Sequence, residues 1–244
     1  MTLWRWAECT RDELRAILPD GIVVLPIGAT EQHGPHLATG TDALLAGTVA
    51  ERAALVAATT SARDLVLAPC LAFGASDHHL PFGGTLSLSS ETMTSVLTDL
   101  GRSVAEDGGR RLVLVNGHGG NRGVCHAAAA TLSARHGMIV AIVHYWELLA
   151  APADGTPVPG HAGEFETSMV LAVRPELVRE RGQRPAIPPE SAVEGVDVHD
   201  AGAWRRIDGY TDEPERANAT RGNAWLEECV TELAGRLGEL GGAL

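Results

Sequence analysis

Glu31 and His33 are the first residues of the chain whose types and spacing suit metal chemistry. They lie two positions apart, so in an extended segment both side chains point to the same side of the backbone. A carboxylate and an imidazole that face one point are natural ligands for a divalent cation such as Zn²⁺, at about 2.0–2.2 Å. Asp42, at the start of a predicted helix, can reach back to the same point. The pattern predicts a metal site, although an isolated Glu-x-His pair is equally compatible with a solvated loop.

His118 is a further candidate ligand, in the glycine-rich turn NGHGGN of residues 116–121. Its glycine neighbours carry no side chains, so the imidazole is free to enter a crowded centre. Taken alone, such a histidine is more often a buried, hydrogen-bonded residue than a ligand. The turn is only a weak match to a phosphate-binding loop, since it lacks the spacing of the dinucleotide fingerprint and the lysine of a P-loop.

Three more clusters of reactive or aromatic residues occur along the chain: DHH at 77–79, HYWE at 144–147 and HAGEFETS at 161–168. His78 and His79 are expected to support the metal ligands or to face a substrate, unless they lie in a hydrated loop. Tyr145 and Trp146 can supply an apolar wall for a flat, small substrate. Eight of the ten histidines lie in or near these polar segments, which favours one shared site.

The elements that position these residues alternate between strands and helices. Four short apolar, β-branched runs predict strands, and the Ala/Leu-rich stretches between them, with charges at helical spacing, predict helices. The strands are expected at 22–27, 65–69, 112–115 and 138–144, and the helices at 42–58, 91–106 and 121–136. Near-continuous hydrophobicity is typical of parallel strands buried on both faces. This order predicts an α/β fold whose sheet binds ligands beyond the carboxyl ends of its strands, where the polar clusters lie.

The pattern changes after about residue 150. Residues 151–160 are rich in proline and glycine and predict a loop. A helix is expected at 164–173, an irregular stretch at 185–210, and a second helical pattern at 223–240. The length of 244 residues fits a single domain over residues 1–244.

Composition narrows the classes of partner and location. A formal net charge of −12 disfavours nucleic acid and anionic membrane surfaces, which both need clustered Lys and Arg. No apolar run approaches the roughly 20 residues that a membrane span requires, and the first residues lack the pattern of a signal peptide. The four cysteines are far apart and predict free thiols in a reducing compartment. We therefore expect a cytoplasmic protein.

Four segments together resemble the creatininase family of metal-dependent amidohydrolases. They are GATEQHGPH (28–36) with Asp42, DHHLPFGGTLSL (77–88), NGHGGN (116–121) and HAGEFETS (161–168), in the family's order within residues 20–175. The resemblance implies a three-layer αβα fold, often a homohexamer, with one or two divalent metals per subunit. By position, the chain matches family metal ligands at Glu31, His33, Asp42 and His118. Asp42 would bridge two metals, and His161 matches the histidine that shuttles a proton.

One position departs from creatininase itself, which has a carboxylate two residues after the histidine of Asn-Gly-His. This chain has Gly120 there, a form found in other branches of the family. We expect Glu166 to replace that ligand and to act with His161 in catalysis. The departure leaves open whether one or two metals bind, and it argues against creatinine as the substrate. The residues expected to contact the substrate or support the ligands are His36, His78, His79, Gly119 and Trp146.

The predicted activity is hydrolysis of a C–N amide bond, in a cyclic or small non-peptide amide, by metal-activated water. His161 would protonate the departing nitrogen as general acid. The family alternatives are a peptidase that trims a modified peptide, as in the mycofactocin-associated branch, and a deformylase of an opened nucleobase ring. A metal or nucleotide binder without turnover is the alternative from another class. Mixed carboxylate and imidazole ligands suit Zn²⁺ and also admit Mn²⁺ or Fe²⁺.

Overall fold

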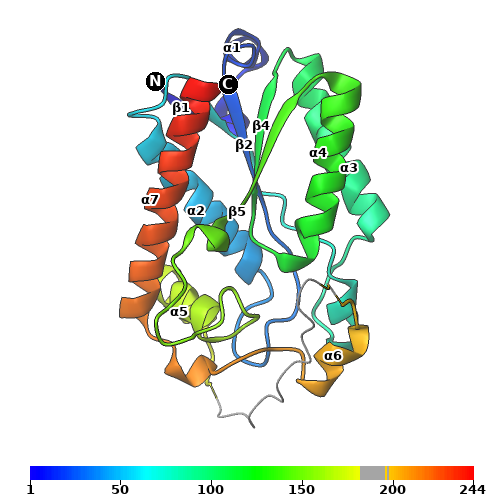
Figure 1. Ribbon diagram of the computed structural model, residues 1–244, viewed down its shortest axis with the longest axis vertical. Helices are drawn as coiled ribbons and strands as arrows, with labels where there is room; N and C mark the ends of the chain where they lie inside the picture. Colours follow the sequence, from blue (N-terminus) through cyan, green and yellow to red (C-terminus); the bar gives the residue numbers. More distant parts are fainter. Residues whose placement is uncertain (182–195, 197) are drawn as a thin grey trace.

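The buried strands of the chain pair in parallel into one five-stranded sheet, in the order β1-β3-β2-β4-β5 (Figure 1). This computed structural model describes residues 1–181, 196 and 198–244. The strands are β1 (Leu3–Arg5), β2 (Ile22–Ile27), β3 (Leu65–Leu67), β4 (Arg111–Asn116) and β5 (Ile139–His144). The parallel sheet expected from the sequence is confirmed.

Helices cover both faces of the sheet, so the fold has three layers. Helices α2, α5 and α7 pack on one face, and α1, α3 and α4 on the other (Figure 1). The helices are α1 (Arg11–Ile17), α2 (Thr41–Ala57), α3 (Ser90–Glu106), α4 (Arg122–His136), α5 (Glu164–Val173), α6 (Ala201–Arg206) and α7 (Ala219–Ala243). Among the described helices, none is long and apolar enough to cross a membrane.

Strand β2 is apolar at every position because it lies in the middle of the sheet, between β3 and β4. Successive side chains of a strand point to opposite faces. Ile22 and Val24 enter the core under α2 and α7, whereas Val23, Leu25 and Ile27 enter the core under α3 and α4. All six residues of the strand are buried, because both faces of the sheet are covered.

The strand order of the sheet reverses between the neighbouring strands β2 and β4. From β2 it continues to β3 on one side, and from β4 it continues to β5 on the other. Because α2 and α4 then cover opposite faces, a crevice opens between the carboxyl ends of β2 and β4. The segments that follow these two strands carry the candidate metal ligands.

Several elements differ from the sequence prediction. The pattern did not predict β1, which is three residues long and owes its place to pairing with β3. It also did not predict α1, although Thr10 and Glu13 form a capping box there that is a local signal for a helix start. Helix α6 lies within the stretch expected to be irregular, and residues 185–195 and 197 of that stretch lie outside the described residues. Helix α7 starts earlier than expected, because the Asn218 side chain caps it.

Candidate metal centre

The loop after β2 brings Glu31 and His33 against the first turn of α2, where Asp42 lies. Gly28 permits this close approach, since a Cβ at that position would lie 2.4 Å from the backbone nitrogen of Ala43. The N–H of Glu31 donates to the carbonyl of Thr39, which folds the loop back on itself. All three candidate ligands of this segment are almost fully buried, as the sequence hypothesis of a shared centre requires.

The hydrogen bonds of His33 determine which of its ring nitrogens faces the centre. Nδ1 lies 3.0 Å from the backbone carbonyl oxygen of Glu31, which can only accept, so Nδ1 carries the proton. Nε2 then faces Oδ1 of Asp42 at 3.1 Å and Oε2 of Glu166 at 3.8 Å. A backbone carbonyl that fixes one nitrogen while the other faces acceptors is the arrangement typical of a metal-ligating histidine.

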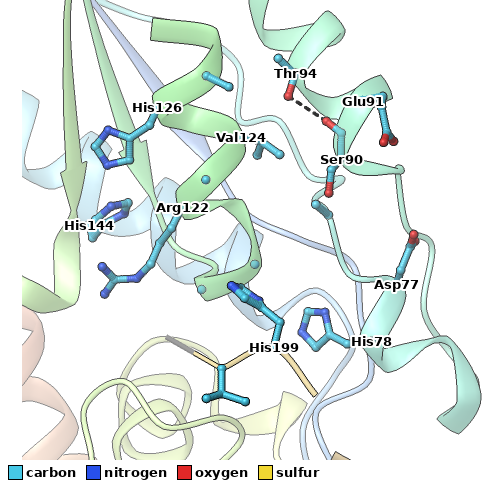
Figure 2. Close-up of a pocket in the computed structure, with 16 residues that line it drawn as sticks. Asp77, His78, Ser90, Glu91, Thr94, Arg122, Val124, His126, His144 and His199 are labelled. Carbon is cyan, nitrogen blue, oxygen red and sulfur yellow. Dashed lines mark hydrogen bonds between the residues drawn. The ribbon is translucent and has the colours of Figure 1, made fainter. Parts of the chain in front are cut away.

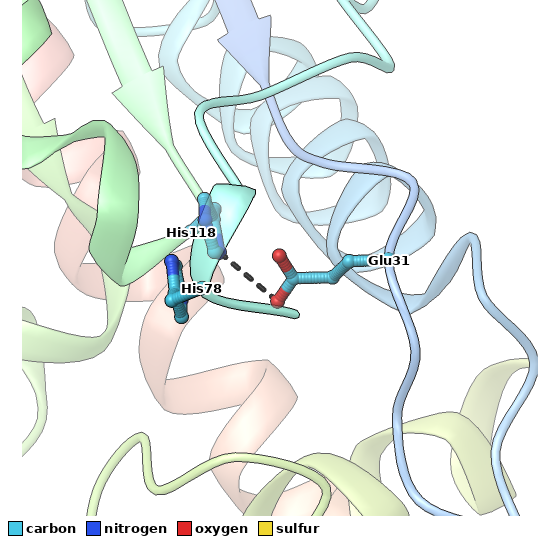
Figure 3. A group of neighbouring side chains, drawn as sticks. All are labelled: Glu31, His78 and His118. Carbon is cyan, nitrogen blue, oxygen red and sulfur yellow. Dashed lines mark ion pairs between the residues drawn. The ribbon is translucent and has the colours of Figure 1, made fainter. Parts of the chain in front are cut away.

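His118 repeats this arrangement from the turn after β4. Its Nε2 lies 3.2 Å from the carbonyl oxygen of Ala75, so this nitrogen carries the proton. Its Nδ1 faces Oε1 of Glu31 at 3.2 Å (Figure 3). The same nitrogen faces Oδ2 of Asp42, also at 3.2 Å. The side chain of Asn116 holds the turn, because it donates to the carbonyl of His118 and accepts from its N–H.

The electrostatics of the centre favour positive charge. Burial by itself lowers the pKa of His33, but Asp42, Glu166 and Glu31 outweigh it and raise the pKa to about 10. His118 follows the same rule, since its carboxylate neighbours overcome burial and raise its pKa well above the ordinary value. Burial would raise the pKa of Glu31, yet the surrounding histidines hold it well below its usual range. A point that binds protons this strongly also suits a divalent cation.

The residues present fit a divalent metal. Within the described part of the chain, neither oxygen of Glu31 nor Oδ2 of Asp42 has a hydrogen-bond partner, although all three atoms are buried. A buried carboxylate without hydrogen-bond partners is costly, and a divalent cation held between these oxygens and the imidazole nitrogens that face them would offset this cost. Three groups of potential ligand atoms each lie within 4.8 Å of one another: Glu31, His78 and His118; Glu31, His33 and His161; His33, Asp42 and Glu166.

Glu166 reaches the centre from α5, which is far away in the sequence. Its carboxylate accepts a hydrogen bond from the N–H of Ala162 at 2.6 Å and faces His33. Burial raises the pKa of Glu166 to about 8, although His33 opposes the shift. His36 lies behind this residue, where its Nε2 donates to the carbonyl of Ala162 at 2.9 Å. His36 therefore positions the segment that carries His161 and Glu166.

His161 lies beside Glu31, on the loop that precedes α5. Its Nε2 donates to the carbonyl of Gln32 at 2.9 Å, and its Nδ1 lies 3.5 Å from Oε1 of Glu31. The ring stacks on His79 with centroids 4.2 Å apart, and His79 Nδ1 accepts from the Gln32 side chain. Burial, together with His33, lowers the pKa of His161 well below its usual value. The imidazole is therefore neutral, with a free lone pair on Nδ1.

A groove of about 1190 Å³ lies beside the centre (Figure 2). Its lining includes His78 and Gly120, which lie next to His118. One wall comes from α4 and the turn before it, and the other from η2 (Asp77–Phe82) and the start of α3. His78 is only partly buried, unlike the other residues of the centre. The groove is also lined by Asp77, Glu91, Gly119, Arg122, His126, His144 and His199.

Two tryptophans have places that the sequence pattern did not indicate. Trp146 is only 3% exposed and belongs to the core, where its ring stacks on His144. Trp204 of α6, which the sequence analysis did not single out, has its ring 4.7 Å from that of His79 and 5.4 Å from that of His161. No local signal marks Trp204, because only the folding of α6 over η2 brings it to the centre.

Known proteins resemble this chain over most of its length. The family model named Creatininase, described as creatinine amidohydrolase, matches residues 7–237. A protein of Mycobacterium tuberculosis named mycofactocin precursor peptide peptidase is 36% identical, over 93% of this chain and 89% of its own length. The creatinine amidohydrolase of Pseudomonas putida is 32% identical, over 93% of this chain and 92% of its own length.

Solved structures match the fold as well. A structure named Creatininase Mn has a TM-score of 0.78 and 29% identity, and the match covers 96% of this chain and 97% of that one. A mutant creatininase described as Zn-Zn type matches to a similar extent. Manganese and zinc forms thus exist among the structures that share this architecture.

Proposed function

This chain belongs to the creatininase family, and from that premise we propose that it hydrolyses the amide bond of a peptide bound in the groove. It is an amidohydrolase, which acts on C–N bonds. The observation that carries the metal-dependent mechanism is the convergence of imidazole nitrogens on buried carboxylates, of which both oxygens of Glu31 and Oδ2 of Asp42 have no hydrogen-bond partner among the described residues. The proposed metal ligands are Glu31, His33, Asp42, His118 and Glu166.

A bound divalent cation would lower the pKa of a coordinated water and polarise the substrate carbonyl. The protein supplies the proton transfers. His161 is neutral in the resting site, so its Nδ1 takes a proton from the attacking water and passes it to the departing nitrogen. The carbonyl of Gln32 holds the Nε2 proton and keeps the ring in the required orientation throughout.

The size of the groove supports the choice of a peptide over a small cyclic amide. Sites for drug-sized ligands occupy about 300–1,000 Å³, and this groove, at about 1190 Å³, is larger. The tuberculosis relative is named as a peptidase of a precursor peptide. A small cyclic amide remains the second candidate substrate, favoured by the relative named creatinine amidohydrolase, although Gly120 lacks the carboxylate of creatininase itself.

The proposal extends to the metal, the assembly and the location. Zn²⁺ or Mn²⁺ suits the mixed ligand set, and forms of creatininase with each metal are among the structural neighbours. The family resemblance also supports assembly into a homohexamer in which each chain forms one catalytic domain. It supports a location in the cytoplasm as well. Light scattering after size-exclusion chromatography tests the oligomer.

Metal-loaded protein tests the activity directly, with short peptides, cyclic amides and formamides as substrates. We expect amine release from at least one peptide, and loss of that activity after chelation. Turnover that survives chelation would contradict the mechanism. Alanine at Glu31 or at His118 that leaves both metal content and activity intact would contradict it independently.

A further inference from the structure

The position at which creatininase carries a carboxylate cannot carry a side chain in this structure. A Cβ added to Gly120 would lie 2.4 Å from the backbone oxygen of Ala75 and 2.5 Å from Nε2 of His118. Carbon atoms do not approach backbone so closely, and neither neighbour is the mobile end of a flexible chain. His78 fills the adjoining space, with its Cε1 3.1 Å from the same Cβ position. Any ligand beside His118 must therefore come from another segment.

His78 supplies a ring nitrogen beside His118. It lies on η2, and its ring is parallel to that of His118, with centroids 5.8 Å apart. The ligand atoms of Glu31, His78 and His118 all lie within 4.8 Å of one another. Figure 3 shows the Glu31 carboxylate pointing toward the two imidazoles. One carboxylate and two imidazoles form a ligand set suited to Zn²⁺.

This outer group differs from the inner group of His33, Asp42 and Glu166 in its access to solvent. All three inner residues are buried, whereas His78 is partly exposed and lines the groove beside Gly120. Catalytic metal sites have three protein ligands and an open position toward the substrate, whereas structural sites are closed. The outer group meets this description and the inner group does not.

We propose that His78, with Glu31 and His118, holds the metal ion that faces the groove, in place of the carboxylate that creatininase has at the position of Gly120. The inner ion belongs to His33, Asp42 and Glu166. This inference rests on the proposed function, because it presumes a divalent metal at the centre. An imidazole in place of a carboxylate also favours Zn²⁺ over Mn²⁺ at the outer position, since carboxylate ligands suit Mn²⁺ better.

Metal content and the visible spectrum of Co²⁺ test this assignment without an activity assay. Metal-free protein is loaded with Zn²⁺ or Co²⁺, desalted and analysed for metal per chain. We expect His78→Ala to lose one ion, or to bind it at least ~10-fold more weakly, while His126→Ala, a histidine variant in the same groove, matches the wild type. Glu166→Gln should lose the other ion, with a different change in the Co²⁺ spectrum.

His78→Glu separates loss of a ligand from loss of structure. A carboxylate at this position restores a ligand, so we expect the variant to regain the outer ion and to shift its relative affinity from Zn²⁺ toward Mn²⁺. If His78→Ala binds metal like the wild type and leaves the Co²⁺ spectrum unchanged, His78 is no ligand and this inference fails while the proposed function stands. If the wild type binds no divalent metal, the proposed function itself fails. If the wild type binds a single ion, its loss in His78→Ala supports the assignment and its retention overturns it.

Discussion

Nε2 of His33 lies 3.1 Å from Oδ1 of Asp42, and the other oxygen of Asp42 lies 3.2 Å from Nδ1 of His118. One carboxylate therefore faces two histidines that arrive on the ends of two neighbouring strands, β2 and β4. Both imidazoles have their remaining nitrogen fixed by a backbone carbonyl. This placement makes Asp42 the link between the inner and outer ligand groups.

Asp42→Asn should abolish metal binding at both groups while leaving the fold intact. The amide removes the negative charge that both histidines face, so we expect affinity for Zn²⁺ to fall at least ~10-fold. The metal-free variant should be less stable than metal-free wild type, because the buried His33 and His118 lose the carboxylate that they face. Metal analysis and thermal unfolding check the two effects, and a variant that keeps full metal content would remove Asp42 from the ligand set.

Removal of metal should lower the thermal stability of the wild type. A cation that binds only the folded state at 100 times its Kd stabilises it by about 2.7 kcal/mol. For a chain of this size, that corresponds to a fall in Tm of roughly 5–10 °C on chelation. Differential scanning calorimetry with and without chelator measures the change. Asp42→Asn provides the control, since chelation should leave its Tm unaltered.

His161→Ala should separate proton transfer from metal binding. His161 Nδ1 lies 3.5 Å from Glu31, farther than His118 does, and the proposed role of this nitrogen is to carry a proton. We expect kcat of this variant to fall about 10²–10⁴-fold, while its metal content stays equal to that of the wild type. Loss of a metal ion in this variant would instead identify His161 as a ligand.

Gly222→Ala tests the contact that places Glu166. Gly222 of α7 packs on α5, and a Cβ there would lie 1.8 Å from the backbone oxygen of Ser168. The helices must separate to admit it, so we expect a loss of about 3 kcal/mol or more in the free energy of unfolding, with weaker metal binding. Gly235→Ala is the matched control on the same helix, since nothing lies near its Cβ. That variant should gain about 0.5–1 kcal/mol, and equal effects of the two substitutions would be inconsistent with this packing.

Trp204 and Trp146 should respond differently to the same substitution. Trp204→Leu removes a ring that lies against His79 and His161, so KM for a peptide substrate should rise about 10-fold with little change in Tm. Trp146 is a core residue, so Trp146→Leu should lower Tm while KM stays near the wild-type value. Steady-state kinetics and thermal unfolding distinguish the two, and the reverse pattern would make Trp146 the substrate wall.

Much of the layout could be predicted from local patterns. Near-continuous apolar, β-branched runs and the helical stretches between them indicated the sheet and its layers, because burial on both faces imposes a sequence pattern that is visible without the fold. The segment with Glu31 and His33 follows β2, and the glycine-rich turn around His118 follows β4. Their convergence follows from the rule that the carboxyl ends of parallel strands meet at one edge of the sheet.

The tertiary structure alone decided which residues complete the centre. Nothing local shows that Trp204 of α6 covers His79 and His161. The partial exposure of His78 beside the closed inner group depends on how η2 packs against the turn at Gly120. These placements arise from contacts between segments far apart in the chain. The periodicity of apolar residues along the sequence does not indicate such contacts. The sequence by itself therefore indicated which residues could bind a metal. The folded structure decided how these candidates group and which group faces the groove, because grouping depends on distances that only packing sets.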